Sequence, residues 1–164
     1  MVKINLARNT HVPIFKRRRT GQTDYSKRKS MITSRSTILS IRISNKHSTF
    51  QFIEPKIVGD AIKSSGHSSQ INKLGWKGSG KSLHGLYLTG YLAGKKAKSA
   101  GLDKAILYIG RREFHSGLKI VCALKGVIDA GISIPVDKDI LPDDEKFKTD
   151  TVQKIIDEIN SKYG

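Results

Sequence analysis

The stretch from Gly75 to Ser82 reads GWKGSGKS and satisfies the pattern G-x-x-x-x-G-K-[ST]. In nucleotide-binding proteins such a loop holds phosphates with glycine N–H groups, a lysine and a hydroxyl that binds magnesium. The pattern needs a buried strand before it, but the preceding HSSQINKL is polar, and no later strand ends in an Asp for the metal. We therefore expect no nucleotide hydrolysis, although the glycines and Lys81 would suit another anion, such as an RNA phosphate.

The chain from Lys16 to Lys29, KRRRTGQTDYSKRK, carries seven Lys and Arg residues around one acid, Asp24. Arginine forks match the geometry of phosphate oxygens, and Tyr25 offers a ring on which a base could stack. This composition cannot bury enough apolar surface to offset chain entropy, so we expect the arm to lack fixed structure away from its partner. RNA contact is the favoured interpretation, and a solubilising or nuclear-targeting tail is the alternative.

Shorter polar groups elsewhere offer further RNA contacts, each with a plainer alternative. Arg42 lies on the polar face of a predicted strand, which a solvated sheet face explains equally well. His67 precedes two serines, but no nearby carboxylate orients it for catalysis, so a loop that touches sugar and phosphate is favoured. Arg111 and its neighbour follow an apolar strand, where a phosphate clamp and an exposed loop are equally compatible. The predicted RNA-binding residues are Lys16, Arg17, Arg18, Arg19, Thr23, Tyr25, Lys27, Arg28, Lys29, Arg35, Arg42, Lys46, His47, His67, Ser68, Ser69, Lys77, Lys81, Arg111 and Arg112.

Neither catalytic nor metal-binding residues form a recognisable set. Glu113 and His115 are two potential ligands without a second pair, and the acids of residues 137–145 lack the spacing of a calcium loop. We therefore expect no catalysis, no metal, no cofactor and no small-molecule substrate.

The charge of the chain says more about its partner than about its fold. Its 164 residues suggest one domain with extensions, and the net charge of +16 is large for this length. Residues 1–35 hold ten Lys and Arg with one acid, whereas residues 136–164 hold five with eight acids. Nucleic acid is favoured over a membrane, because the longest stretch free of charged residues, 82–94, is too short to span a bilayer. Cys122 is the only cysteine, which permits no internal disulfide and fits a reducing cytosol.

The elements that must position these residues follow from hydrophobic periodicity. Residues 37–44 and 47–54 alternate apolar and polar side chains and predict a half-buried hairpin. A third strand is possible near residues 56–63, and the Gly- and Ser-rich residues 64–82 indicate a loop with at most a short helical turn. Helical spacing then runs from a cap at Ser82 to a stop at Gly101. Gly90 and Gly94 lie on one face of that helix, which favours close packing of this face on the sheet.

The second half of the chain adds a strand and two helices. Residues 104–110 are apolar on both faces and predict a central strand, and a helix capped by Ser116 and stopped by Gly131 follows. A short helix near the end must dock on this core or on a partner, because it is marginal alone. Its apolar stripe consists of Val152, Ile155, Ile156, Ile159 and Tyr163.

These elements predict an α/β fold: a small mixed β-sheet with helices packed on it, an extended basic N-terminal arm and a short C-terminal helix. The domain boundaries that we expect are a basic RNA-binding arm (1–36), an α/β core (37–136), and an acidic linker with the amphipathic C-terminal helix (137–164).

Four motifs, in order along the chain, resemble one known family. The arm resembles the K/R-R-R-x-G-x-T-D-Y signature of the large-subunit ribosomal proteins that bind 5S rRNA, the L-eighteen family in its archaeal and eukaryotic branch, through KRRRTGQTDYSKRKSMI. The family's first hairpin is similar to SIRISNKHSTFQFI. Its Gly-rich turn and following helix are similar to GWKGSGKSLHGLYLTGYLAGKKAKSAGL, and its G-x-x-D-A-G-x-x-I-P segment to KGVIDAGISIPV. The resemblance covers about residues 10–142, and the length of the chain fits an archaeal source.

The resemblance implies a structural protein of the large ribosomal subunit in the cytoplasm, and not an enzyme. It would bind 5S rRNA, help attach it at the central protuberance, touch large-subunit rRNA, and neighbour the 5S-binding protein of the L-five family. The implied fold is a small mixed sheet with helices on one face. The family more often has a neutral pair where this chain has Lys81 and Ser82, and the residues after Pro142 match nothing in it. The alternatives are a nucleotide hydrolase that uses Gly75–Ser82, and a protein that compacts nucleic acid.

Overall fold

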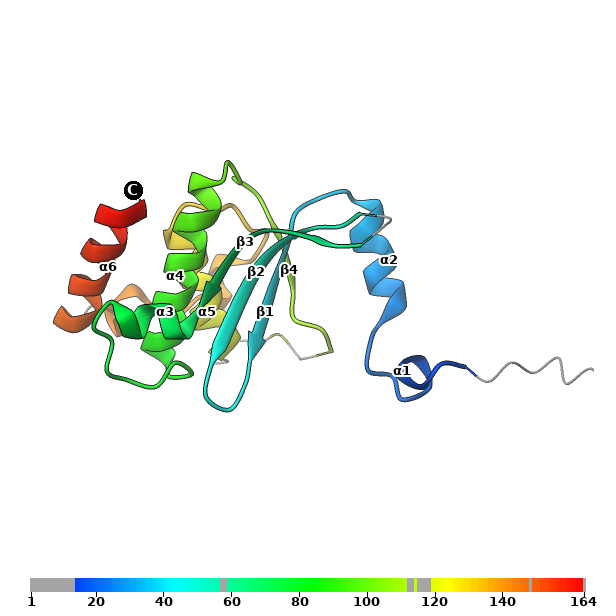
Figure 1. The fold of residues 1–164 in the computed structure, drawn as a ribbon, viewed down its shortest axis with the longest axis horizontal. Coiled ribbons are helices and arrows are strands. Elements are labelled where there is room, and N and C mark those ends of the chain that lie inside the picture. Colours follow the sequence, from blue (N-terminus) through cyan, green and yellow to red (C-terminus); the bar gives the residue numbers. More distant parts are fainter. Residues whose placement is uncertain (1–13, 57–58, 112–113, 115–118, 148, 164) are drawn as a thin grey trace, which may run out of the picture.

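A computed structural model describes residues 14–56, 59–111, 114, 119–147 and 149–163 of the chain. It confirms an α/β fold, with a mixed sheet of four strands and helices packed on it (Figure 1). The elements in chain order are α1 (Lys16–Arg19), α2 (Tyr25–Thr33), β1 (Ile38–Ile43), β2 (Ser48–Glu54), β3 (Ala61–His67), α3 (Ser68–Lys73), α4 (Leu83–Ser99), β4 (Ile106–Tyr108), α5 (Lys119–Asp129), the 3₁₀ turns η1 (Lys138–Ile140) and η2 (Asp144–Phe147), and α6 (Asp150–Tyr163).

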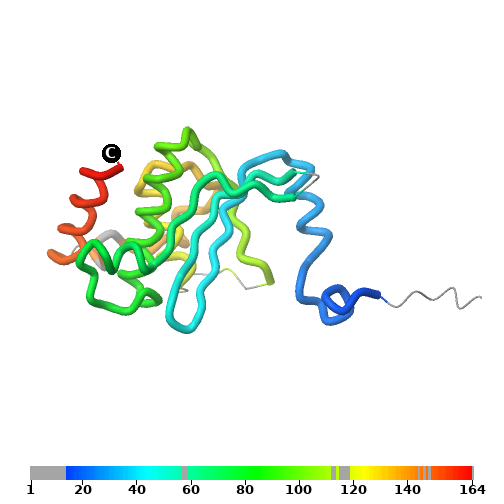
Figure 2. Tube along the Cα trace, viewed as in Figure 1, coloured from blue at the N-terminus to red at the C-terminus, as the bar shows by residue number. Residues whose placement is uncertain are grey.

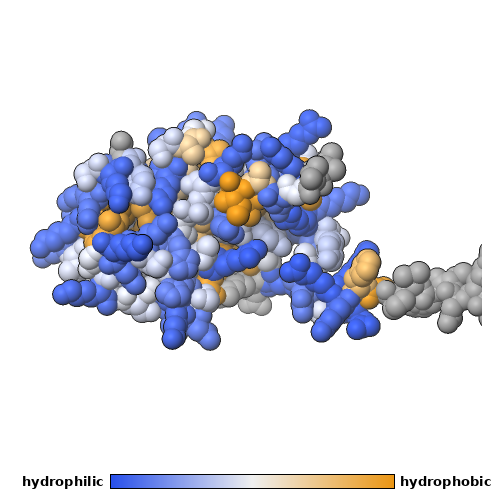
Figure 3. Space-filling view, viewed as in Figure 1, coloured by the Kyte–Doolittle hydropathy of each residue, from blue (hydrophilic) through white to orange (hydrophobic). Residues whose placement is uncertain are grey.

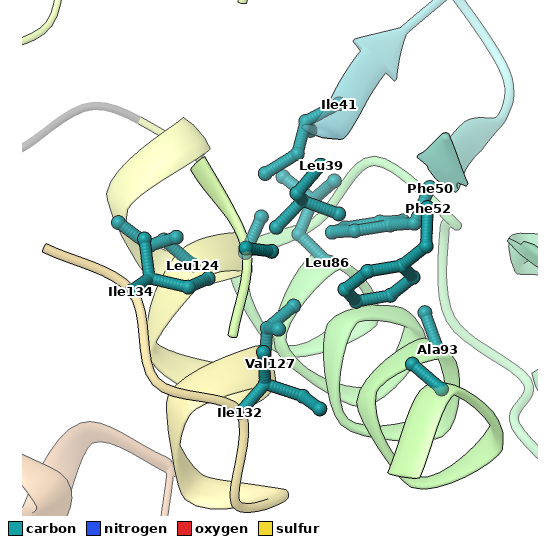
Figure 4. Close-up of a cluster of buried hydrophobic side chains, with 13 residues drawn as sticks. Leu39, Ile41, Phe50, Phe52, Leu86, Ala93, Leu124, Val127, Ile132 and Ile134 are labelled. Atoms are coloured by element: carbon teal, nitrogen blue, oxygen red, sulfur yellow. The ribbon is translucent and has the colours of Figure 1, made fainter. Parts of the chain in front are cut away.

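The predicted hairpin forms the centre of the sheet, whose strand order is β3-β2-β1-β4. β1 and β2 pair antiparallel, with Leu39 opposite Phe52 and Ile41 opposite Phe50. These four side chains are buried, and they point from one face of the sheet toward α4 and α5 (Figure 4). The alternation in the sequence therefore indicates the main core correctly.

The other face of the hairpin is also covered at one end, so β1 is more than half-buried. Met31 of α2 packs there with Ile38 and Ile53, and Ser40 is buried as well. The arm thus supplies a small second layer, opposite the face that carries α4 and α5. Because Ser40 is polar, the sequence pattern does not indicate that this face of β1 is buried.

Two strand predictions need correction. The third strand is β3 (Ala61–His67), later than residues 56–63, and it includes residues expected in a loop. It is polar because it lies at the edge of the sheet and only Ser64 and Gly66 are buried. β4 was expected in the centre but forms the opposite edge, parallel to β1. Its apolar side chains are explained by packing on both faces, since Leu107 meets the main core and Ile106 meets the Met31 cluster.

Helix α4 has the predicted ends but a different close neighbour. The Ser82 hydroxyl oxygen accepts a hydrogen bond from the N–H of Gly85 at 3.1 Å, and Gly101 has a φ of +79°. Gly90 and Gly94 face α5 and not the sheet. A Cβ on Gly94 would lie 2.6 Å from the Ala130 Cβ. A Cβ on Gly90 would collide with the carbonyl oxygen of Ala123 in α5. The two glycines therefore permit close approach of two helices, and the prediction of packing on the sheet is wrong.

Helix α5 buries Val121 and Cys122, and the chain turns after it at Gly131, whose φ is +98° and which was predicted to stop the helix. The expected cap at Ser116 lies outside the described residues.

Helix α6 docks on the protein's own core, which resolves an alternative that the sequence leaves open. Val152, Ile155 and Ile159 are buried in a cluster that includes Tyr87 and Tyr91 of α4. The Tyr91 hydroxyl donates a hydrogen bond of 2.8 Å to the Asn160 side chain. Figure 1 shows α6 and the basic arm at opposite ends of the molecule, so the acidic C-terminal segment lies far from the arm.

Candidate nucleic-acid interface

The basic arm contains two helices joined by a defined turn. Asp24 begins α2, and its carboxylate accepts a hydrogen bond from the N–H of Lys27 at 3.0 Å. The Arg18 guanidinium lies 6.0 Å from the centre of the Tyr25 ring. The sequence led us to expect an arm without fixed structure. The Asp24 cap and the burial of Met31 on the sheet are the local features that give it helices instead.

Three contacts join the arm to the body. Met31 is buried in the cluster on the sheet, Arg28 of α2 forms an ion pair with Asp60 before β3, and Arg111 after β4 donates a hydrogen bond to the carbonyl oxygen of Gly21. Gly21 has a φ of +61°, and any Cβ there would collide with the Arg111 guanidinium. Arg28 and Arg111 therefore hold the arm in place, and part of their hydrogen-bonding capacity is used within the protein.

A second basic region forms where the β1–β2 turn meets the start of α3 and the Gly-rich loop (Figure 2). The Ser68 hydroxyl oxygen accepts a hydrogen bond from the N–H of Ser48 at 3.2 Å and lies 3.1 Å from Nδ1 of His47. The Ser48 hydroxyl donates to the carbonyl oxygen of Gly80 at 3.0 Å. These bonds bring together Lys46, His47, His67, Ser69 and Lys81, which we call the hairpin cluster.

Ser68 itself corrects one prediction. It was expected to contact RNA, but it is 0% exposed, and its hydroxyl bonds within the protein. Its role in this structure is to hold the hairpin cluster together from inside.

The Gly-rich loop has the wrong surroundings for a nucleotide site, as the sequence suggested. It follows α3 and not a strand. The Ser82 hydroxyl, which would bind magnesium, donates to the carbonyl oxygen of Ser79 at 2.7 Å and caps α4. Lys77 and Lys81 are exposed. Across the described part of the chain, no group of three His, Cys, Asp or Glu side chains could hold a metal ion.

Two acids beside the arm are paired with bases, one of which, Arg28, belongs to the arm itself. Asp60 pairs with Arg28. Glu54 lies 3.0 Å from the Lys63 ammonium. The hydrogen bond from Lys63, with the nearby charge of Lys56, lowers the pKa of Glu54 below its ordinary value.

The remaining predicted contacts divide by exposure. Thr23 is half-buried, and Arg112 lies outside the described residues. Of the remaining predicted contacts, Arg35 and Arg42 are exposed. Figure 3 shows hydrophilic side chains over most of the arm and along the lower edge of the molecule in that view.

One candidate escaped the sequence reasoning. Phe15, directly before the basic run, is 85% exposed, and an exposed aromatic ring beside arginines can stack on a base. Its position next to KRRR was the signal that could have revealed it.

The described helices include none that is long and apolar enough to cross a membrane. Comparison with known proteins identifies relatives that match most of the chain.

The family model for "Ribosomal large subunit proteins 60S L5, and 50S L18" matches residues 11–105, which include the arm from residue 11 onward and the hairpin cluster. "Large ribosomal subunit protein uL18" of Korarchaeum cryptofilum is 40% identical over 148 residues, which cover 90% of this chain and 76% of that protein. The protein of that name from Methanothermobacter thermautotrophicus is 36% identical over 148 residues, or 90% and 77%. The one from Aeropyrum pernix is 40% identical over 142 residues, or 86% and 66%. The chain therefore belongs to the uL18 family of large ribosomal subunit proteins, and these relatives are archaeal.

Proposed function

We propose that this ribosomal protein binds 5S rRNA and helps hold it on the large subunit at the central protuberance. In that position it would also touch large-subunit rRNA and a neighbouring 5S-binding protein of the L-five family. Its part in the subunit would be structural, without catalysis. The observation that carries the proposal is the exposed basic arm, folded around the Asp24 cap and anchored to the body.

The arm is suited to a folded RNA for two physical reasons. Lys16, Arg17, Arg18 and Arg19 are all exposed, and each phosphate that they neutralise releases a bound counterion, which drives association. Tyr25 is 45% exposed beside Arg18, and a ring of this kind adds stacking on an unpaired base. Charge supplies affinity, and the shape of the turn supplies the means to prefer one RNA.

The domain boundaries expected from the sequence are part of this proposal. Residues 1–36 would be the RNA-binding arm, residues 37–136 the core that presents the hairpin cluster, and residues 137–164 a segment that stabilises the core. The burial of α6 on α4 supports the last assignment.

The test is filter binding of 5S rRNA, tRNA and duplex DNA at several salt concentrations. We expect 5S rRNA to bind most tightly, with an affinity that falls steeply as salt rises. Arg18→Gln should weaken binding and reduce the slope of log affinity against log salt by about 0.9. Lys154→Gln removes the same charge from an exposed position on α6 and should change little.

Equal affinity for 5S rRNA and tRNA would reject the specific proposal and leave a general RNA-binding protein. A preference for duplex DNA would favour a protein that compacts nucleic acid.

A further inference from the structure

Two histidines from different strands lie side by side in the hairpin cluster. His47 directly precedes β2 and is exposed, and His67 ends β3 and is half-buried. Their ring centres are 5.1 Å apart. Hydrogen bonds within the protein determine which nitrogen of each ring carries the proton.

The Nδ1 of His67 must be an acceptor. It receives a hydrogen bond from the backbone N–H of Ser69 at 3.2 Å and lies 2.7 Å from the Ser69 hydroxyl. Because a backbone N–H can only donate, a proton on Nδ1 would place two donors against each other. The neutral ring therefore carries its proton on Nε2.

The same conclusion holds for His47 through Ser68. The Ser68 hydroxyl is fully buried and accepts from the N–H of Ser48. A buried hydroxyl proton needs an acceptor, and among the described residues Nδ1 of His47, at 3.1 Å, is the group that can accept it. The neutral ring of His47 then also carries its proton on Nε2.

Both rings therefore offer an Nε2–H donor, and none of the described protein groups bonds to either Nε2. Two lysines lie beside the pair. Lys46 directly precedes His47, and Lys81 directly follows Gly80. Gly80 itself lies against Ser68, because a Cβ added to it would be 2.6 Å from the Ser68 hydroxyl. Two fixed donors without an acceptor between them suit a ligand rich in oxygen acceptors. In an RNA such a ligand is the backbone phosphate.

We propose that His47 and His67 form a phosphate-binding pair that holds the RNA backbone through neutral Nε2–H donors, with Lys46 and Lys81 attracting the charge. The proposal rests on RNA binding as the proposed function and adds which groups hold the backbone and in which protonation state. It has a distinctive signature, because a neutral donor strengthens binding without releasing a counterion. Removing such a donor lowers affinity but leaves the salt dependence unchanged.

The experiment uses the full chain and substitutions of His47 that separate the two nitrogens. His47→Asn keeps a polar atom near Nδ1 for Ser68 but has nothing at Nε2, whereas His47→Gln places an amide N–H near Nε2. We expect His47→Asn to bind 5S rRNA about tenfold more weakly, as for loss of a hydrogen bond to a charged group. Its salt slope should equal that of the wild type, and His47→Gln should retain most of the affinity. Lys81→Gln should instead reduce the slope by about 0.9.

His67→Asn serves as a second variant, because asparagine is a good helix cap and can replace the Nδ1 contact at the start of α3. Thermal melting checks that each variant is folded. Nitrogen-15 NMR of the free protein reads the tautomers directly, and both rings should be protonated on Nε2.

Each remaining outcome would overturn a stated claim. If both Asn variants bind like the wild type while 5S rRNA is still preferred over tRNA, the pair is not a site and the proposed function stands. If the Asn variants lose affinity for both RNAs equally and the wild type shows no preference, the histidine pair is a phosphate-binding site, and the proposal of specific 5S rRNA binding is wrong. A reduced salt slope in His47→Asn, or a proton on Nδ1 of either ring, would refute the neutral mechanism.

Discussion

Truncating Ile159 tests whether α6 is part of the folded core of the free protein. Ile159 is fully buried against residues of α4. Replacing it with Ala removes three carbons, which cost about 0.8 kcal/mol each in transfer free energy, or about 2.4 kcal/mol together. The cavity left behind adds to this, and measured Ile→Ala losses run from about 2 to 5 kcal/mol. We expect the free energy of unfolding to fall by about 3 kcal/mol.

Urea unfolding followed by circular dichroism gives the free energy, and the melting temperature should fall by about 6 to 12 °C in a chain of this size. Lys154→Ala, at an exposed position of the same helix, is the control and should stay within about 0.5 kcal/mol of the wild type. If α6 can undock while the rest of the protein stays folded, the loss cannot exceed the free energy with which the helix docks. An Ile159→Ala protein as stable as the control would show that α6 is undocked in the free protein, and its apolar stripe would then belong to a partner.

Two further substitutions test the helix packing and the anchoring of the arm. Gly90→Ala should lower the free energy of unfolding by about 1 to 3 kcal/mol in urea titrations, because its methyl group would force α4 away from α5; a neutral effect would contradict the close approach. Arg111→Ala should release the turn at Gly21 and raise amide hydrogen exchange in residues 16–29, without a comparable change in α4. Unchanged exchange in the arm would contradict an anchoring role for Arg111, whereas Arg111→Lys should give an intermediate result.

Local patterns in the sequence predict the central hairpin and the ends of α4 well. Ile41 and Phe50 lie between polar neighbours in the sequence, and their face of the hairpin is the one that the helices cover. The cap at Ser82 is also a local feature, since its hydroxyl bonds to an N–H three residues away. These features follow from short-range periodicity and capping, which a single sequence displays directly.

Features that depend on distant parts of the chain were mistaken or missed. β3 is polar because it is an edge strand, and nothing within it shows which neighbour it lacks. Gly90 could equally have faced the sheet or α5, since either packing explains a small residue. The contact of Arg111 with Gly21 joins residues 90 positions apart, and the sequence left a phosphate clamp and an exposed loop equally open.

In the candidate site, too, local features could be predicted from the sequence and contacts between distant segments could not. The basic arm was evident from composition, and in the structure the carboxylate of Asp24 caps α2 within it. The hairpin cluster was visible only as separate residues, because His47 and His67 meet through strand pairing. Ser68 was assigned to a loop that touches sugar and phosphate, but it is buried and its hydroxyl bonds to His47 and Ser48 at the start of β2.

Buried hydroxyls beneath the hairpin cluster restrain the surface that we propose binds RNA. Ser68 joins the start of α3 to His47 and to the start of β2, and Ser48 of β2 bonds to Gly80 and lies 3.4 Å from the hydroxyl of Thr89 in α4. Leaving one such buried group unpaired costs about 1 to 3 kcal/mol, so each bond restrains the groups at both of its ends. The two imidazoles are therefore placed by the folded core before any RNA arrives. The proposed RNA binding at this end of the sheet would then require little reordering of the protein, which would reduce the entropic cost of association.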